Sequence, residues 1–128
     1  MTDAFRILAN KQLCMQCHQI GKTPNTNQIQ GPPLYLSYQR LRPGWLELWI
    51  ATPQRFLTYA SSMPNNFPVD KPGQYQELFV GTPLEQIIGV RDVLEAYPRV
   101  TALPINHYWA LPLPTETKAA GKTGDNKK

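Results

Sequence analysis

The residues with the most evident chemistry stand near the N-terminus, in the run Cys14-Met15-Gln16-Cys17-His18. Two cysteines separated by two residues and followed directly by a histidine have the spacing that attaches haem c to a protein. On one helical turn Cys14 and Cys17 are neighbours, so both sulfurs can reach one edge of a porphyrin. His18 follows Cys14 by four residues and projects from the same face toward the iron. The motif therefore predicts one covalent haem c with His18 as an iron ligand.

Two other kinds of site would use the same residues. Cys14, Cys17, His18 and His107 have the ligand types of a zinc site, but adjacent residues such as Cys17 and His18 fit poorly around one tetrahedral ion. A thioredoxin-type redox pair needs a strand before it and a helix after it, whereas this sequence predicts a helix before and a loop after. Haem attachment is the favoured interpretation.

A second axial ligand must come from outside the motif. Met63, which is followed by Pro64, and His107 carry the side chains that bind haem iron strongly. Met63 stands in a polar loop with little hydrophobic core to fill, which favours a ligand role over packing. His107 would otherwise be a partly exposed imidazole beside Tyr108 and Trp109. An open or water-bound iron is the third alternative.

Helical patterns dominate the chain, and no pair of strands with alternating polarity stands out. The sequence predicts helices over residues 3–12, 35–41, 43–51 and 83–97, with long Pro-rich loops between them. Thr2 or Asp3 is the expected cap of the first helix. Thr82-Pro83-Leu84-Glu85 has the form of a capping box with proline at the first helical position. The helix that it opens carries a stripe of apolar residues at intervals of three and four: Leu84, Ile87, Ile88, Val90, Leu94 and Tyr97.

The C-terminal part has a different composition. Pro98 is expected to end the last helix, and residues 98–113 are predicted to form an extended surface strap. Residues 114–128 are polar and lysine-rich, which indicates a disordered basic tail. We therefore expect one domain over residues 1–113 followed by this tail. Because Asp3 comes early and no apolar segment follows it, we expect no signal peptide in this sequence.

Further along the chain, several motifs occur in the order found in the small all-α monohaem cytochrome c family, which residues 5–97 resemble. Gly31-Pro32-Pro33-Leu34 resembles the family's Gly-Pro-x-Leu step, and Trp45-Leu46-x-x-Trp49-Ile50-x-x-Pro53 resembles its Trp-Leu helix. Ser62-Met63-Pro64 matches the step that carries the axial methionine. The resemblance implies a cytochrome c fold, with three to five short helices around a haem ligated by His18 and Met63.

The resemblance also implies roles for the residues around the haem. The Pro32 carbonyl would accept the ring N–H of His18 and strengthen its donation to iron. Arg40 falls where the family often places an arginine near the haem propionates, whereas Arg42 reads as a solvated surface charge. Leu34, Trp45 and Trp49 would line the pocket; the alternative for the two tryptophans is ordinary core packing.

The function implied by His18/Met63 ligation is single-electron transfer and not catalysis, because such an iron has no open coordination site. The partners would be redox proteins that dock transiently. In the main alternative, the domain is the electron-entry module of a larger multidomain oxidoreductase and contacts its other domains. A haem ligand sensor would require Met63 to leave the iron. On the family's pattern, covalent attachment of haem places the protein in a bacterial periplasm or an equivalent extracytoplasmic compartment.

Composition and charge exclude other classes of protein. The chain has 128 residues and a net charge of +4, and four of its lysines lie in the last eleven residues. The remaining excess of positive charge is too small to indicate nucleic-acid binding. No apolar run approaches the roughly 18 residues of a membrane-spanning helix.

Overall fold

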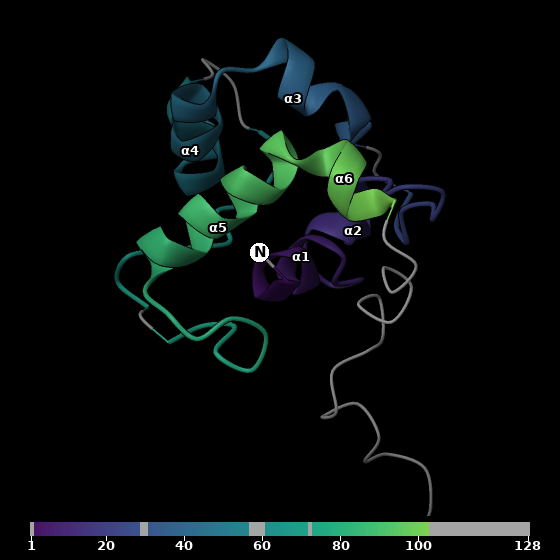
Figure 1. Ribbon diagram of the computed structural model, residues 1–128. Coiled ribbons are helices and arrows are strands. Elements are labelled where there is room, and N and C mark those ends of the chain that lie inside the picture. Colours follow the sequence, from purple (N-terminus) through teal and green to yellow (C-terminus); the bar gives the residue numbers. More distant parts are fainter. Residues whose placement is uncertain (1, 29–30, 57–60, 72, 103–128) are drawn as a thin grey trace, which may run out of the picture.

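The computed structural model describes residues 2–28, 31–56, 61–71 and 73–102, and these ranges contain helices and no β-strand (Figure 1). The α-helices are α1 (Thr2–Leu8), α2 (Cys14–Cys17), α3 (Ser37–Arg40), α4 (Pro43–Ala51), α5 (Pro83–Glu95) and α6 (Tyr97–Thr101), and the 3₁₀ turns are η1 (Leu34–Leu36) and η2 (Pro53–Phe56). The predicted all-α class is confirmed. The described ranges contain six α-helices, more than the predicted three to five. Three of them, α2, α3 and α6, are only four or five residues long. None of the described helices is long and apolar enough to cross a membrane.

Helix α5 forms the centre of the core, and α1 and α4 both pack against it. Its buried residues recur at intervals of three and four and occupy one arc of the helix: Gln86, Ile87, Val90, Val93 and Leu94. Val93 was not part of the predicted stripe, although it has no exposed surface. Leu84 and Ile88 were part of it but lie outside the buried arc, because the period of 3.6 residues places them at its side. Leu84 is 56% exposed as a result.

Two features of α5 explain how closely its neighbours approach. A Cβ atom on Gly89 would stand 3.0 Å from the Cβ of Ala4, so the glycine allows α1 to pack against the helix backbone. The buried amide of Gln86 donates hydrogen bonds to the carbonyls of Gln74 (2.7 Å) and Phe79 (2.9 Å). These bonds satisfy a polar group that would be costly to bury alone, and they hold the preceding loop against the helix.

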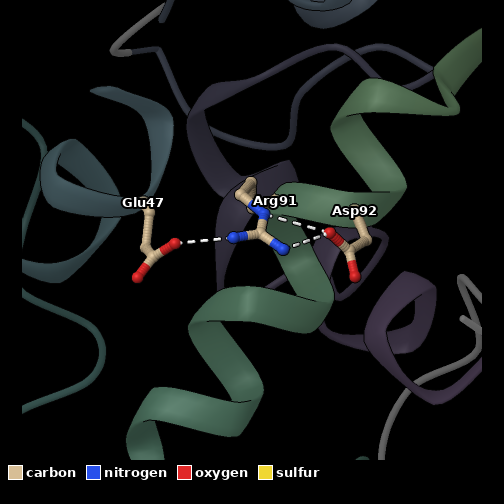
Figure 2. Close-up of polar contacts among 3 residues, drawn as sticks. All are labelled: Glu47, Arg91 and Asp92. Carbon is tan, nitrogen blue, oxygen red and sulfur yellow. Dashed lines mark hydrogen bonds and ion pairs between the residues drawn. The ribbon is translucent and has the colours of Figure 1, made fainter. Parts of the chain in front are cut away.

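An ion pair joins α4 to α5 (Figure 2). The Arg91 guanidinium donates to the Glu47 carboxylate across the two helices at 2.6 Å and to the neighbouring Asp92 carboxylate at 2.7 Å. The bond to Asp92, and more weakly that to Glu47, raises the pKa of Arg91. Leu46 and Val90, which precede the two paired residues in the sequence, are buried. The ion pair therefore joins α4 and α5 at the solvent-facing edge of their contact.

The predicted starts of the two long helices are confirmed. Helix α4 begins at Pro43, whose fixed φ and missing N–H suit the first helical turn. Helix α5 begins with the predicted capping box: the Thr82 hydroxyl accepts from the Glu85 N–H at 3.3 Å, and the Glu85 carboxylate accepts from the Thr82 N–H at 2.7 Å.

The first helix is shorter than predicted, since it ends at Leu8 and not near Gln12. The prediction that Thr2 or Asp3 caps it is also wrong, because both residues lie within its first turn. The early end has a local cause. The buried Asn10 accepts the Gln12 N–H on its side chain at 2.9 Å, and its carbonyl accepts the Leu13 N–H, so this backbone leaves the helical pattern.

The region around Pro98 also differs from the prediction. Pro98 does not end helical structure but stands in the first turn of α6, where a missing N–H costs nothing. Residues 98–101 are therefore helical and not part of an extended strap. Residues 103–113 of the predicted strap, the predicted basic tail and His107 lie outside the described residues.

We predict that Val93→Ala lowers the free energy of unfolding by about 2 kcal/mol, because it removes two buried methyl groups and leaves a cavity in the hydrophobic core around α5. Val69→Ala is the matched control: Val69 is 86% exposed, and the same change there should stay within about 0.5 kcal/mol. Urea unfolding followed by circular dichroism measures both. Equal effects would contradict the position of Val93 in the core.

Candidate functional site

A cavity of about 490 Å³ lies between the motif, the α3–α4 region and α5. Apolar side chains make up most of its wall, and the aliphatic ones that project from the α-helices are Leu8, Leu46, Ile50, Val90 and Leu94. The exposed side chains of Tyr35, Leu41 and Trp45 also line it, so the cavity reaches the surface on that side. Its volume falls in the range of roughly 300–1,000 Å³ that is usual for sites of small ligands and cofactors.

Eight of the nine residues predicted for the site lie on the wall of this one cavity: Cys14, His18, Pro32, Leu34, Arg40, Trp45, Trp49 and Met63. They come from five separate stretches of the chain. Cys17 is the exception, since it is not among the lining residues. It is partly buried and belongs to the same single-turn helix as Cys14.

Met15, the residue after the first cysteine, holds the motif against the hydrophobic core. The side chain of Met15 is buried in the core, so α2 presents Cys14 toward the cavity. The His18 N–H donates to the Cys14 carbonyl at 2.9 Å, but His18 itself has extended backbone angles and ends the helix. The cysteine and the histidine thus share a wall, although they do not share a regular helix.

The loop after the motif folds back and binds its backbone. The N–H groups of Thr26 and Asn27 donate to the carbonyls of Met15 (3.2 Å) and Gln16 (2.9 Å). Further along, the Gly31 N–H donates to the Cys17 carbonyl at 2.6 Å. Carbonyls left without partners at the end of a short helix are therefore satisfied by this loop. The hydrogen bonds hold residues 31–33 beside the histidine.

The imidazole of His18 is oriented by this loop. Its Nδ1 lies 2.7 Å from the Pro32 carbonyl, which can only accept, so Nδ1 carries the hydrogen and the Nε2 lone pair remains for a ligand. The ring lies directly over Gly31: a Cβ atom there would stand 2.7 Å from Nδ1 and 2.9 Å from Nε2. Only glycine leaves room for the ring in this position. The hydrogen bond implied by the resemblance is present in the structure.

Met63 reaches the same cavity from the loop after η2. Its sulfur accepts a hydrogen bond from the indole N–H of Trp49 at 3.1 Å. The Met63 carbonyl accepts from the Gln54 amide at 3.1 Å, and its N–H donates to the Ser61 hydroxyl at 3.2 Å. Backbone and side chain are therefore both held in place, and the thioether lines the same cavity as His18.

The expectation that the Met63 loop has little core to fill is wrong. Phe67 is buried, lines the cavity and packs edge-on against Tyr75, with ring centroids 5.7 Å apart. Phe67 thus forms part of the cavity wall and is supported from behind by Tyr75. Burial, with a smaller contribution from nearby Cys14, raises the pKa of Tyr75, so this phenol stays neutral near neutral pH.

The rings of Trp45 and Trp49 stack on each other, with centroids 5.2 Å apart and an interplanar angle of 10°. Both line the cavity, so they are wall residues and not buried core. Arg40 is the one lysine, arginine, aspartate or glutamate on the described wall, and it is exposed. Arg42 is exposed and does not line the cavity, in agreement with the surface role predicted for it.

The chemistry of Cys14 bears on the zinc and redox alternatives. Burial raises the pKa of this thiol to about 12, so it stays protonated near neutral pH. Thiol–disulfide exchange needs the thiolate, so burial disfavours the redox alternative. His107, one of the four residues of the zinc alternative, lies outside the described residues. In addition, the described residues contain no group of three or more His, Cys, Asp or Glu side chains that could hold a metal ion.

Sequence reasoning missed several contributions to this site. Gly31 was noted only as part of a motif, although a glycine beside the ligand-orienting proline indicates a close approach. Phe67 was missed, although one aromatic residue in a polar loop is a sign of packing. The bond from Trp49 to Met63 has no sequence signature, because it joins residues of two separate segments that meet only in the folded chain.

Comparisons with known proteins found no matching family model, no matching curated protein and no matching solved structure. The geometry of the cavity and the motif at its wall therefore carry the functional argument.

We predict that Gly31→Ala destabilises the protein by about 1–3 kcal/mol, because the new methyl group collides with the His18 ring. Nitrogen NMR of the imidazole should show that Nδ1 loses its hydrogen-bonded proton.

Gly44→Ala is the control for this substitution. Gly44 lies in α4, and a Cβ there meets nothing within 4 Å. The change should stabilise the helix by up to about 1 kcal/mol and leave His18 unchanged. If Gly31→Ala were equally harmless, the ring would not lie over Gly31.

Proposed function

We propose that the protein is a single-electron carrier that holds one haem c, bonded to Cys14 and Cys17 and ligated by His18 and Met63. The observation that carries the proposal is the meeting of His18 and Met63 on the wall of one apolar cavity together with Cys14. These residues come from distant parts of the chain, and the fold brings them together around a space of cofactor size.

The residues present fit a haem in several independent ways. The wall is mostly apolar, as a porphyrin requires, and Arg40 at its exposed part would pair with a propionate. His18 has its Nδ1 bonded to a carbonyl, the usual arrangement for a metal-binding histidine. Met63 offers a thioether, the soft ligand found opposite histidine in c-type cytochromes.

Ligation by His18 and Met63 determines the kind of chemistry. When bound, the haem would supply a centre that gains and loses one electron. With protein ligands on both sides, the iron has no position for a substrate, which favours electron transfer over catalysis. The thioether and the apolar wall both favour the ferrous state and raise the reduction potential. The proposal includes an extracytoplasmic compartment, where haem is attached in this way.

The first test is an optical spectrum of the protein produced together with haem-maturation machinery. We expect a reduced c-type spectrum, a Met–iron band in the oxidised form and pigment that stays with the chain after acid extraction. Cys14→Ala and Cys17→Ala should each weaken covalent retention, and the double variant should lose it. Colourless protein, protein that binds zinc instead, or pigment released from the unaltered chain would contradict the proposal.

The second test concerns the axial ligand. Met63→Leu should remove the Met–iron band and allow the reduced protein to bind carbon monoxide, because leucine preserves the volume but cannot bind iron. Met63→His should keep carbon monoxide out and lower the reduction potential.

The matched control is Met15→Leu, the same substitution in the buried residue of the motif. It should leave the Met–iron band and the absence of carbon monoxide binding unchanged. If the unaltered protein bound carbon monoxide readily, the iron would have an open position and a ligand-sensing role would replace electron transfer.

A further inference from the structure

A second cavity, of about 310 Å³, lies behind the motif and is separate from the cavity that His18 and Met63 line, which we call the first cavity. Cys14 lines the first cavity and its neighbour Met15 lines the second, so α2 stands between the two. Of the described residues, none lines both. The second cavity has a floor of buried apolar side chains, namely Phe5, Ala9, Met15 and Ile20, and a rim of exposed or partly exposed residues, namely Gly21, Lys22, Thr23 and Thr101.

Both sides of the rim are held by Tyr97. Residues 20–23 form a tight turn, which two backbone hydrogen bonds of 2.9 Å and 3.1 Å close. The Gly21 N–H of this turn donates to the Tyr97 hydroxyl at 2.7 Å. On the other side, the Thr101 hydroxyl donates to the Tyr97 carbonyl at 2.8 Å. The opening is therefore fixed by the fold, as is usual for sites that bind small molecules.

The charge at the second cavity is positive. Lys22 is the one charged residue on its described wall, and it is exposed, so its ammonium group can meet a negative group at the opening and stay hydrated. The surrounding sequence has the same sign. Residues 2–23 contain three lysines and arginines and a single acidic residue, Asp3, which lies 3.9 Å from Arg6. The cavity thus combines an apolar interior with a cation at its rim.

We propose that the second cavity binds a small amphipathic carboxylate, with its apolar tail on the floor and its carboxylate beside Lys22. The volume lies at the lower end of the range for ligand sites, which limits the tail to a short chain or a single ring. Burial of the tail supplies most of the affinity, and the ion pair with Lys22 selects an anion over a neutral or cationic molecule. The proposal goes beyond electron transfer and does not depend on it, because the walls of the two cavities are separate.

The test compares four probes by calorimetric titration into the full chain: hexanoate, hexanol, hexylamine and acetate. Hexanoate should bind most tightly. Hexanol keeps the tail but lacks the charge, so it should bind about three- to fivefold more weakly, the ratio expected for one exposed ion pair. Hexylamine should bind more weakly than hexanol, because its ammonium group meets a like charge. Acetate lacks the tail and should give no measurable binding.

NMR of methyl groups locates the bound probe. The methyl signals of Met15 and Ile20, which lie on the floor of the second cavity, should shift as hexanoate is added. Met63 is the control, because it lines the first cavity, and its methyl signal should stay in place. A shift of Met63 without a shift of Met15 would place hexanoate in the first cavity and overturn the proposal.

A substitution tests the charge separately from the tail. Lys22→Gln should weaken the binding of hexanoate by about three- to fivefold and leave that of hexanol unchanged. The difference between Lys22→Gln and the unaltered protein should largely vanish at about 0.5 M salt. Lys11→Gln is the matched control. Lys11 is also exposed but lines neither cavity, so this variant should bind hexanoate like the unaltered protein.

Several other outcomes would overturn the proposal. Hexanoate that fails to bind, or binds no better than hexylamine, would do so, as would equal effects of Lys22→Gln and Lys11→Gln. Nuclear Overhauser contacts between Phe5 and residues that follow Ala102 would assign the second cavity to the chain itself. Failure of the electron-carrier proposal is distinct, because it would appear as protein without covalent pigment, which these titrations do not measure.

Discussion

The space above Gly31 is the constraint on which the candidate site depends. The His18 ring occupies it, and this position lets Nδ1 reach the Pro32 carbonyl. The same loop supplies N–H groups to the carbonyls of the motif, so the histidine and its orienting carbonyl belong to one hydrogen-bonded unit. Directly after this unit the chain enters η1 and α3, which form the next part of the cavity wall. A side chain at position 31 would therefore disturb the motif and the wall together.

Two kinds of interaction hold α4 and α5 together on the other side of the cavity, and they differ in how much they contribute to stability. The ion pair between Arg91 and Glu47 is partly exposed, and such pairs contribute about 0–1 kcal/mol. Each large side chain buried between α4, α5 and α1 contributes about 1.5–3 kcal/mol. Apolar packing therefore determines that these helices meet, whereas the ion pair fixes how they align. The cavity persists beside this packing because Trp45, Trp49 and Met63 form a wall of large side chains that do not fill the space.

Local signals in the sequence were sufficient for much of the fold. The prolines and the capping box determine where α4 and α5 begin through backbone chemistry that depends on few neighbours. Eight of the nine predicted site residues line one cavity, because the order of short motifs indicates which loops meet there. Features that depend on distant contacts were not predictable. Pro98, for example, stands in the first turn of α6, a helix that packs against η1. The early end of α1 depends instead on local bonds that Asn10 accepts from Gln12 and Leu13, a signal that was overlooked.

The buried Tyr97 links the two ends of the described chain. Its hydroxyl oxygen accepts the backbone N–H of Gly21, 76 residues away, at 2.7 Å, while its ring belongs to the hydrophobic core. Gly21 lies three residues after His18, so this hydrogen bond joins α6 to the segment that carries the motif. The two ends should consequently unfold in one cooperative step: α6 cannot detach from the core without releasing the backbone just beyond His18.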